Sequence, residues 1–233
     1  MRQTPAVDMS LPADEPAARP WRVATLAELL EVIFEAAEAP EGRPRVVAVD
    51  GRGASGKSTL ANRLYAAVPT CTVVSTDDVA WYHSFFGWTE LLATGVLEPA
   101  RRGESVSYRP PAWQERGRAG AIEVPAGRQL LIVEGVGAGR RELTDLLDAV
   151  VWVQSDFDVA EQRGIARDVA EGVNGDAEAA ANFWHEWMAE ELIFLADQRP
   201  WERACVVVAG TPPSDLGPDQ VLLATPPAAG LSR

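Results

Sequence analysis

The sequence predicts an α/β fold in which helices cover a mainly parallel sheet. Short apolar runs recur along the 233 residues, and segments with helical periodicity separate them. The run around residues 46–49 is continuous, as expected of a central parallel strand that is covered on both faces. A glycine-rich turn and a helix-forming segment follow that run directly. Strands separated by helices in this way build a parallel sheet.

The composition fits one soluble domain and limits its partners. Hydrophobic residues make up 47% of the chain and charged residues 24%, which are ordinary values for a globular protein. The formal net charge of -13 argues against nucleic acid as a partner, because binding to a phosphate backbone needs a basic face. No apolar stretch is long enough to span a membrane, and no signal peptide is evident. We therefore expect a cytoplasmic protein without a membrane partner, and a homodimer is left open.

The two ends of the chain are rich in proline, and both are predicted to be loose. Residues 1–22 contain four prolines and are expected to be disordered, and residues 212–233 contain five and are expected to form a flexible tail. Between them, a helix is predicted over residues 25–38. Thr25 and Glu28 form a capping box at its start, and apolar residues recur at helical spacing after them.

The central part, residues 23–211, is predicted to be a single domain. We expect core strands at 45–50, 71–75, 129–133, 149–154 and 205–208. Residues 121–124 could pair with 129–133 as a hairpin. Residues 79–125 form an insert that would bind an acceptor substrate, and residues 156–176 form a lid. A long helix is expected from about residue 177 to 197.

The turn after the first core strand predicts a phosphate-binding loop. Its residues fit the pattern G-x-x-x-x-G-K-[ST] and have the required strand before and helix after. The glycines let the backbone turn its N–H groups inward, and the helix N-terminus attracts an anion. A chance glycine turn is the alternative, which the flanking strand and helix disfavour. The predicted nucleotide-binding residues are Gly51, Gly53, Ala54, Ser55, Gly56, Lys57, Ser58 and Thr59.

Two carboxylates at strand ends are candidates for the chemistry. Asp77 follows the strand at 71–75, and Glu134 closes the strand at 129–133. Carboxyl ends of parallel strands face the ligand crevice. Asp77 is predicted to contact the reacting groups, although one of the acids at 77 and 78 could simply cap a helix. Ser58 and Glu134 are predicted to position Mg²⁺, and an incidental acid at a strand end is the alternative for Glu134.

Arginines are concentrated in the insert and in the lid. Arg163 and Arg167 share one helix face and could close over a transferring phosphoryl group, or could pair with neighbouring acids. The insert combines arginines with aromatic residues, which suits an acceptor pocket. The alternative is a small hydrophobic subdomain with solvated arginines. The predicted acceptor-binding residues are Asp77, Tyr82, His83, Tyr108, Arg109 and Trp113.

Four segments resemble the uridine kinase and phosphoribulokinase-like P-loop kinases, a group that includes the nicotinamide riboside kinases. They are residues 51–59, 75–78, 132–135 and 156–168, and their order and spacing agree with the group. The resemblance implies a three-layer P-loop NTPase sandwich with a five-stranded parallel sheet in the order 2-3-1-4-5. It also implies that Asp77 is the catalytic base, that Glu134 helps to hold Mg²⁺, and that Arg163 and Arg167 contact the ATP phosphates. The nucleotide base would lie near the last strand and the loop after it.

Two departures from the group concern the acceptor and the lid. Tyr108 is followed by Arg109, where uridine kinases usually have an aspartate that binds the nucleoside. Gly164 follows Arg163, where relatives often have another arginine. Phosphoryl transfer is therefore expected, but uridine is not the expected acceptor. An arginine in place of that acid favours an anionic or a different sugar-like acceptor.

These observations predict a kinase that uses ATP or GTP and Mg²⁺. It would phosphorylate a hydroxyl group of a small nucleoside- or sugar-like metabolite, with Lys57, Asp77, Arg163 and Arg167 as catalytic residues. One alternative is a regulatory or assembly ATPase that binds nucleotide without a small acceptor. Another is a phosphotransferase that modifies an antibiotic or other secondary metabolite.

Overall fold

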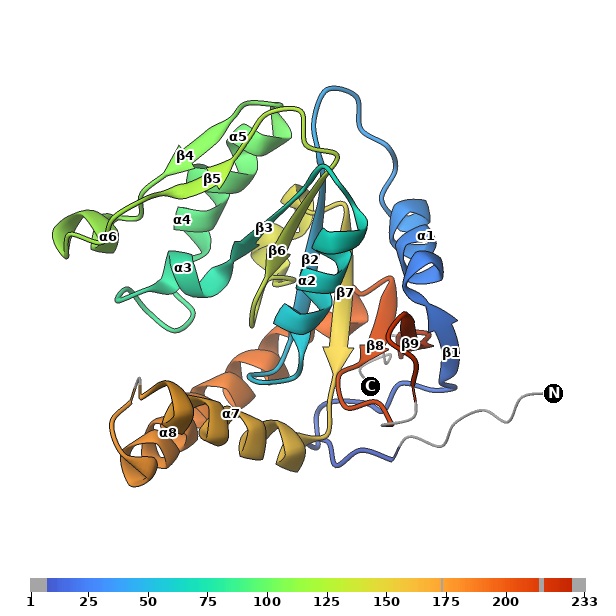
Figure 1. The fold of residues 1–233 in the computed structure, drawn as a ribbon, viewed down its shortest axis with the longest axis vertical. Coiled ribbons are helices and arrows are strands. Elements are labelled where there is room, and N and C mark those ends of the chain that lie inside the picture. The colour runs from blue at the N-terminus through green and yellow to red at the C-terminus, as the bar shows by residue number, and fades with distance from the viewer. Residues whose placement is uncertain (1–7, 173, 214–215, 228–233) are drawn as a thin grey trace.

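A seven-stranded sheet forms the middle layer of the computed structural model (Figure 1), which describes residues 8–172, 174–213 and 216–227. Five strands run parallel: β2 (Arg45–Gly51), β3 (Cys71–Ser75), β6 (Leu130–Glu134), β7 (Ala149–Gln154) and β8 (Val206–Ala209). Their spatial order is β3-β6-β2-β7-β8. When only these five parallel strands are numbered along the chain, their order is 2-3-1-4-5, as the family resemblance implies.

The sheet is larger than predicted, because segments at both ends of the chain add antiparallel strands. β9 (Gln220–Ala224) pairs with β8, and β1 (Arg22–Thr25) pairs with β9. Residues 212–233 are thus not a flexible tail throughout, since four of the five residues of β9 are buried. The prolines lie before and after β9 and mark its two ends.

The N-terminal segment also differs from the prediction of disorder where the structure describes it. Glu15, Ala18 and Trp21 are buried, and the Gln154 side chain accepts a hydrogen bond from the Ala18 N–H at 2.9 Å. Residues 8–21 therefore pack against the sheet. The predictions for residues 1–7, 173, 214–215 and 228–233 lie outside the described residues.

One sheet face is covered by two helices. They are α1 (Leu26–Ala36) and α2 (Lys57–Ala67), whose apolar side chains pack on alternate residues of the parallel strands. α1 begins with the predicted capping box: Thr25 accepts from the Glu28 N–H, and the Glu28 carboxylate accepts from the Thr25 N–H. Figure 1 shows α1 at the edge of the molecule that also carries β1.

The other face is covered by the insert and by α8 (Ala177–Gln198), the second helix of a helical hairpin. The first helix of the hairpin is α7 (Phe157–Glu171). The insert holds four short helices, a π-helical turn and a two-stranded sheet. These are α3 (Thr76–Ala80), α4 (Thr89–Leu92), the π-turn Ala93–Leu97, α5 (Glu98–Arg101), β4 (Val106–Tyr108), α6 (Pro111–Glu115) and β5 (Ile122–Val124). Short 3-10 helices occur at Arg141–Leu146 and Pro200–Glu202.

The prediction that residues 121–124 pair with 129–133 is wrong. β5 pairs with β4, with Ile122 opposite Tyr108, while β6 lies between β2 and β3. Burial explains the choice: β6 is buried at every position, as a central strand requires, whereas β5 alternates between buried and exposed residues.

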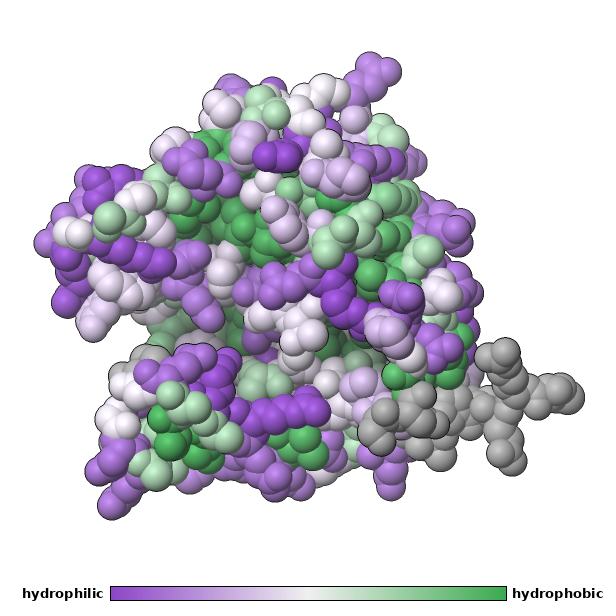
Figure 2. Space-filling view, viewed as in Figure 1, coloured by the Kyte–Doolittle hydropathy of each residue, from purple (hydrophilic) through white to green (hydrophobic). Residues whose placement is uncertain are grey.

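The insert and the α7–α8 hairpin lie on the same side of the molecule (Figure 1), and Figure 2 shows the surface hollowed between them. The carboxyl ends of β2, β3 and β6 lie together at one edge of the sheet, because Glu134 lies beside both Val49 and Ser75 in the strand register. Among the described residues, no helix has the length and apolarity needed to span a membrane.

Candidate functional site

The loop between β2 and α2 has the glycines that its geometry requires. A Cβ atom at Gly51 would lie 2.6 Å from Ser55 Oγ and 2.7 Å from the Val153 carbonyl oxygen, so only glycine fits. Gly56 has a φ of +97° and is the N-cap of α2. Lys57 and Ser58 form the first turn of α2, where backbone N–H groups and the helix dipole favour an anion.

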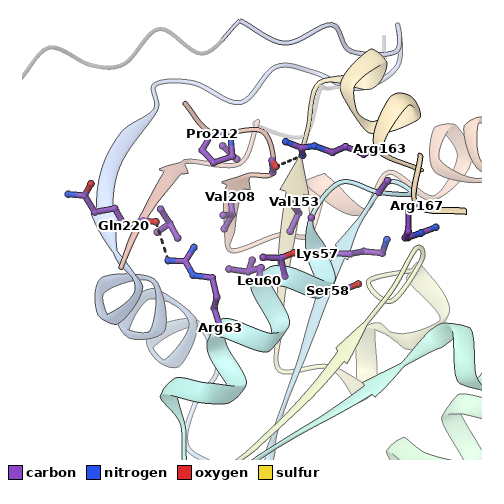
Figure 3. Close-up of a pocket in the computed structure, with 16 residues that line it drawn as sticks. Lys57, Ser58, Leu60, Arg63, Val153, Arg163, Arg167, Val208, Pro212 and Gln220 are labelled. Atoms are coloured by element: carbon purple, nitrogen blue, oxygen red, sulfur yellow. Dashed lines mark hydrogen bonds between the residues drawn. The ribbon is translucent and has the colours of Figure 1, made fainter. Parts of the chain in front are cut away.

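A cavity of about 560 Å³ adjoins this loop (Figure 3). Its walls come from the loop and α2, from β7, β8 and β9, and from α7. Gly210 and Pro212 place the segment after the last parallel strand on the cavity rim, where the family resemblance would put a nucleotide base. Arg63 lies at the far end and donates to the Gln220 carbonyl at 3.1 Å.

Lys57 of α2 and the arginines Arg163 and Arg167 of α7 line this one cavity. The Lys57 ammonium donates to the Arg52 carbonyl at 3.1 Å and so folds back over its own loop. Arg163 donates across the cavity rim to the Gly210 carbonyl at 3.1 Å. Arg167 pairs with the Asp168 carboxylate at 2.9 Å. Pairing with a neighbouring acid on α7 thus describes Arg167 but not Arg163.

Ser58 and Glu134 meet at the edge of the loop. Ser58 Oγ donates to Glu134 Oε2 at 3.0 Å, although the two residues belong to α2 and β6. Within the described ranges, no three His, Cys, Asp or Glu side chains cluster as a cation site. Mg²⁺ commonly takes only one or two protein carboxylates and fills its other positions with phosphate oxygens and water. A hydroxyl and a carboxylate at this spacing fit that requirement.

Asp50 holds the loop that follows Glu134. This carboxylate is fully buried and accepts hydrogen bonds from the backbone N–H groups of Gly51, Gly137 and Gly139 at 2.7–2.8 Å. Burial raises the pKa of Asp50, and the three backbone donors oppose that rise. Asp50 therefore ties the ends of β2 and β6 together. The sequence did not single it out because it reads as the last residue of an apolar strand.

Asp77 lines a second, smaller cavity of about 130 Å³. It stands in the first turn of α3, whose N-cap Ser75 accepts a hydrogen bond from the Asp77 N–H at 3.3 Å. The cavity walls are mainly aromatic and come from the insert, from the loop after β6 and from α8. The residues around Asp77 are Thr76, Ala80, Trp81, Ser84, Phe85, Trp88, Val136 and Trp187.

Arg140 supports the aromatic wall from behind. Its guanidinium carbon lies 3.7 Å from the centre of the Trp88 ring, and Nη1 donates to the Phe86 carbonyl at 2.7 Å and to the Thr89 hydroxyl. Burial lowers the pKa of Arg140 to about 10, which leaves it charged at neutral pH. The segment 81–88 is therefore fixed by a buried cation as well as by packing.

The other predicted acceptor-binding residues do not line the Asp77 cavity. Tyr82 is exposed beneath the Arg116 guanidinium, and His83 Nε2 lies 3.2 Å from the Gly87 carbonyl. Arg109 donates to the Arg118 carbonyl at 2.8 Å. Tyr108 packs against Gly95, and Trp113 is buried and donates to the Asp78 carbonyl at 2.8 Å. These side chains build the insert itself.

Sequence reasoning missed several residues because their partners are far away along the chain. Arg52, in the phosphate loop, forms buried ion pairs with Glu15 and Glu191. Trp187 lines the Asp77 cavity from α8, more than a hundred residues after Asp77. The only local signal was a charged residue, Arg52, inside a loop that otherwise holds small residues.

No protein-family model matches the chain. The chain is 26% identical to a uridine kinase of Clostridium novyi (strain NT), over 55% of this chain and 70% of that relative. A provisionally assigned fructose transport system kinase from Silicibacter sp. TM1040 is 25% identical, covers 68% of this chain and 87% of that structure, and gives a TM-score of 0.53. A provisionally assigned uridine kinase of Bacillus stearothermophilus is 20% identical over 77% of this chain and 98% of that structure, with a TM-score of 0.44. The chain is thus similar in sequence to a uridine kinase, and in sequence and fold to a structure described as a fructose transport system kinase.

Proposed function

We propose, on the premise that the chain is a small-molecule kinase of uridine kinase-like fold, that it transfers the γ-phosphoryl group of ATP to a hydroxyl group of an uncharged small metabolite. The observation that carries the proposal is the pair of cavities at the carboxyl edge of the sheet. One is lined by Lys57, Ser58, Arg163 and Arg167, and the other by Asp77. The first is suited to an anionic donor and the second to a proton-bearing acceptor.

The donor side would act by positioning and by electrostatics. Lys57 and the N–H groups at the start of α2 would hold the phosphates, and the two α7 arginines would meet the charge on the transferring group. Ser58 and Glu134 would hold Mg²⁺, which when bound would neutralise part of the phosphate charge. Binding the donor would require Arg163 and Arg167 to exchange their present partners, the Gly210 carbonyl and the Asp168 carboxylate, for phosphate oxygens.

On the acceptor side, Asp77 would serve as the general base. It would take the proton of the acceptor hydroxyl as that oxygen forms a bond to the γ-phosphorus and the bond to the ADP oxygen breaks. The position of Asp77 supports this role, because Ser75 at the end of β3 lies beside Glu134 in the sheet. The base would then stand next to the residue proposed to hold the metal.

The lining of the Asp77 cavity favours an acceptor without charge. Asp77 is the only ionisable side chain among its lining residues, which include three tryptophans and a phenylalanine. An anionic acceptor would face that carboxylate without a compensating cation. Arg109, which suggested an anionic acceptor, donates to the Arg118 carbonyl instead. We therefore favour a neutral alcohol that presents a ring or another flat apolar face, which includes nucleoside- and sugar-like compounds.

An acceptor screen tests this function. ADP release from MgATP would be measured with neutral nucleosides, sugars, ring-bearing alcohols and antibiotics, and with sugar acids as the anionic set. We expect one neutral class to raise ADP release at least tenfold over water, and Lys57→Ala to remove the stimulated rate. Stimulation by the sugar acids alone would contradict the neutral acceptor. Slow ATP hydrolysis that no compound stimulates would instead indicate a regulatory ATPase.

A further inference from the structure

A buried charged cluster lies beneath the phosphate loop and joins it to two distant segments. Glu191 of α8 is fully buried, and its Oε1 accepts a hydrogen bond from the Gly53 N–H at 2.6 Å. Its other oxygen lies 3.7 Å from Arg52 Nη1. Arg52 Nε donates to the Glu15 carboxylate at 2.7 Å, and Trp152 Nε1 donates to the same carboxylate at 2.8 Å.

The cluster keeps a carboxylate where burial opposes its charge. Burial raises the pKa of Glu191, while the Arg52 guanidinium, the Gly53 N–H and the Lys57 ammonium act in the opposite direction. A buried carboxylate that lost these partners would be strongly destabilising. The buried Glu191 side chain therefore keeps its partners only while the loop keeps its shape. In turn, Glu191 is the hydrogen-bond acceptor for the Gly53 N–H group of the loop.

The same helix contacts the acceptor cavity one turn earlier. Trp187 lines the Asp77 cavity and packs edge-on against Phe85, with ring centres 4.9 Å apart. It also lies against the loop, because a Cβ atom at Gly53 would stand 3.2 Å from its indole nitrogen. Trp187 and Glu191 are four residues apart, so they share one face of α8.

We propose that Glu191 and Trp187 are positioning residues through which α8 joins the acceptor cavity to the phosphate loop. Glu191 fixes the Gly53 backbone so that the loop keeps its phosphate-accepting shape before the donor arrives, which removes a cost of ordering at the moment of binding. Trp187 packs on the same backbone and forms a wall of the cavity that holds Asp77. This inference rests on the proposed function, and it adds a physical link between the donor and acceptor sides.

Calorimetry with MgADP tests the role of Glu191 without any need for the acceptor. The hydrogen bond to Gly53, not the negative charge, is what the proposal requires. We expect Glu191→Ala to weaken MgADP binding at least tenfold and Glu191→Gln to restore it to within about threefold of the wild type. Glu191→Asp keeps the charge but is one methylene too short, so it should bind as poorly as Glu191→Ala. Glu190→Ala removes an exposed carboxylate next to it and is the matched control.

The outcomes separate this inference from the function on which it rests. No MgADP binding by the wild type would reject the donor site itself. Wild-type affinity in folded Glu191→Ala would overturn the positioning role alone. If Glu191→Ala does not fold, the comparison of Glu191→Asp with Glu191→Gln decides, and equal affinities in those two variants would also overturn the role. A purely structural contribution would lower the melting temperature and leave the affinity of the folded protein unchanged.

Tryptophan fluorescence tests the role of Trp187. MgADP binding should alter the emission of the wild type, since the loop against which this indole packs would contact the phosphates. We expect Trp187→Phe to lose a clear part of that change, with the remainder coming from Trp184, whose indole would also lie 3.2 Å from a Cβ atom at Gly53. Trp113→Phe should keep the full change, because Trp113 is buried in the insert and donates to the Asp78 carbonyl. A full wild-type change in Trp187→Phe would show that α8 does not sense the loop there.

Discussion

The two sides of the proposed site are built by different means. The donor side centres on one continuous segment, residues 51–58, whose backbone and first helical turn would do most of the binding, while Arg163 and Arg167 line the cavity from α7. The acceptor side is a cavity lined by side chains from α3 and the turn after it, from the loop after β6 and from α8. The backbone of the donor loop can be inferred from a short motif. The acceptor cavity exists only once distant segments have packed together.

This difference explains why the reaction is easier to infer than the substrate. A glycine loop that precedes a helix has few other uses, and its phosphate-binding groups belong to the backbone. An aromatic or an arginine can instead belong to a pocket, a core or a surface. Trp113 and Trp187 illustrate this. Both stand among polar and apolar neighbours in the sequence, but Trp113 is buried in the insert and Trp187 lines the cavity.

The largest expected effect is on the donor side. Lys57→Ala removes the cation proposed to hold the phosphates at the start of α2, so we expect the rate of phosphoryl transfer to fall about a thousandfold or more. The acceptor cavity is lined by other residues, so acceptor affinity should change little. Initial-rate kinetics over both substrates give the two values. An equal loss of acceptor affinity would show that the two sides are less independent than their construction suggests.

The next largest effect is expected at the boundary between the two sides. Asp77→Asn keeps the shape of the side chain but removes its ability to accept a proton, and a general base commonly contributes about 10²–10⁴ in rate. We expect the transfer rate to fall by about that factor while MgADP affinity stays within about twofold. Asp78→Asn is the neighbouring control, since Asp78 pairs with Arg118 and does not line the cavity. Near-normal turnover by Asp77→Asn would exclude it as the base.

The central sheet and the phosphate loop could be predicted because each depends on local patterns. Continuous apolar runs predicted the five parallel strands, and the capping box predicted the start of α1. β9 was missed because its burial depends on pairing with β8 and β1, while the prolines on both sides suggested a loose tail. The packing of residues 8–21 was missed because it also depends on distant partners. The sequence around Glu15 is typical of a loose tail, and its partners Arg52 and Trp152 lie far along the chain.

The candidate site shows the same limit at the level of single residues. The places of Asp77, Glu134, Arg163 and Arg167 could be inferred because strand ends and one helix face fix where such side chains lie, and their roles stay predictions. Arg109 was expected to bind an anionic substrate because the sequence shows its charge. The sequence does not show that its guanidinium donates to the Arg118 carbonyl. A hydrogen bond to a backbone carbonyl cannot be predicted from the pattern of side chains.

A smaller effect is expected in the α7–α8 hairpin, which carries Arg163 and Arg167. Gly164 stands where the family resemblance implies an arginine, and a methyl group there would overlap the Trp184 indole. Alanine normally favours a helix over glycine by about 0.5–1 kcal/mol. Gly164→Ala should nevertheless lower the free energy of unfolding by about 1–3 kcal/mol, because overpacking opposes that gain.

A double-mutant cycle checks this origin. In a Trp184→Leu background the same substitution should be neutral or stabilising, as measured by chemical denaturation. Gly164→Ala should also reduce the rate with MgATP, since it displaces the helix that carries Arg163 and Arg167. A loss that persists unchanged in the Trp184→Leu background would locate the cause elsewhere in the hairpin.

The smallest effect is expected far from the donor, where the insert is fastened to the sheet. Asp148 accepts hydrogen bonds from Arg43 at 2.7 Å, from the Val46 N–H at 2.8 Å and from Arg101 of α5 at 3.1 Å. Burial by itself would raise the pKa of Asp148, but the bonds from Arg43, Val46 and Arg101 outweigh it and hold the pKa below its usual value. Asp148→Asn should cost about 1–2 kcal/mol at pH 7, with Asp145→Asn as an exposed control.

The pH dependence follows from the direction of that shift. A carboxylate whose pKa is lowered by folding stabilises the native state above its unfolded pKa of about 4, and this stabilisation is lost as the pH falls through the lower folded value. The gap in unfolding free energy between the wild type and Asp148→Asn should therefore be constant above about pH 5 and close as the solution is made more acidic. Because Arg101 belongs to the insert, the variant should weaken acceptor binding more than MgADP binding. Equal weakening of both would mean that the insert also supports the phosphate loop, which would join the two sides through the sheet as well as through α8.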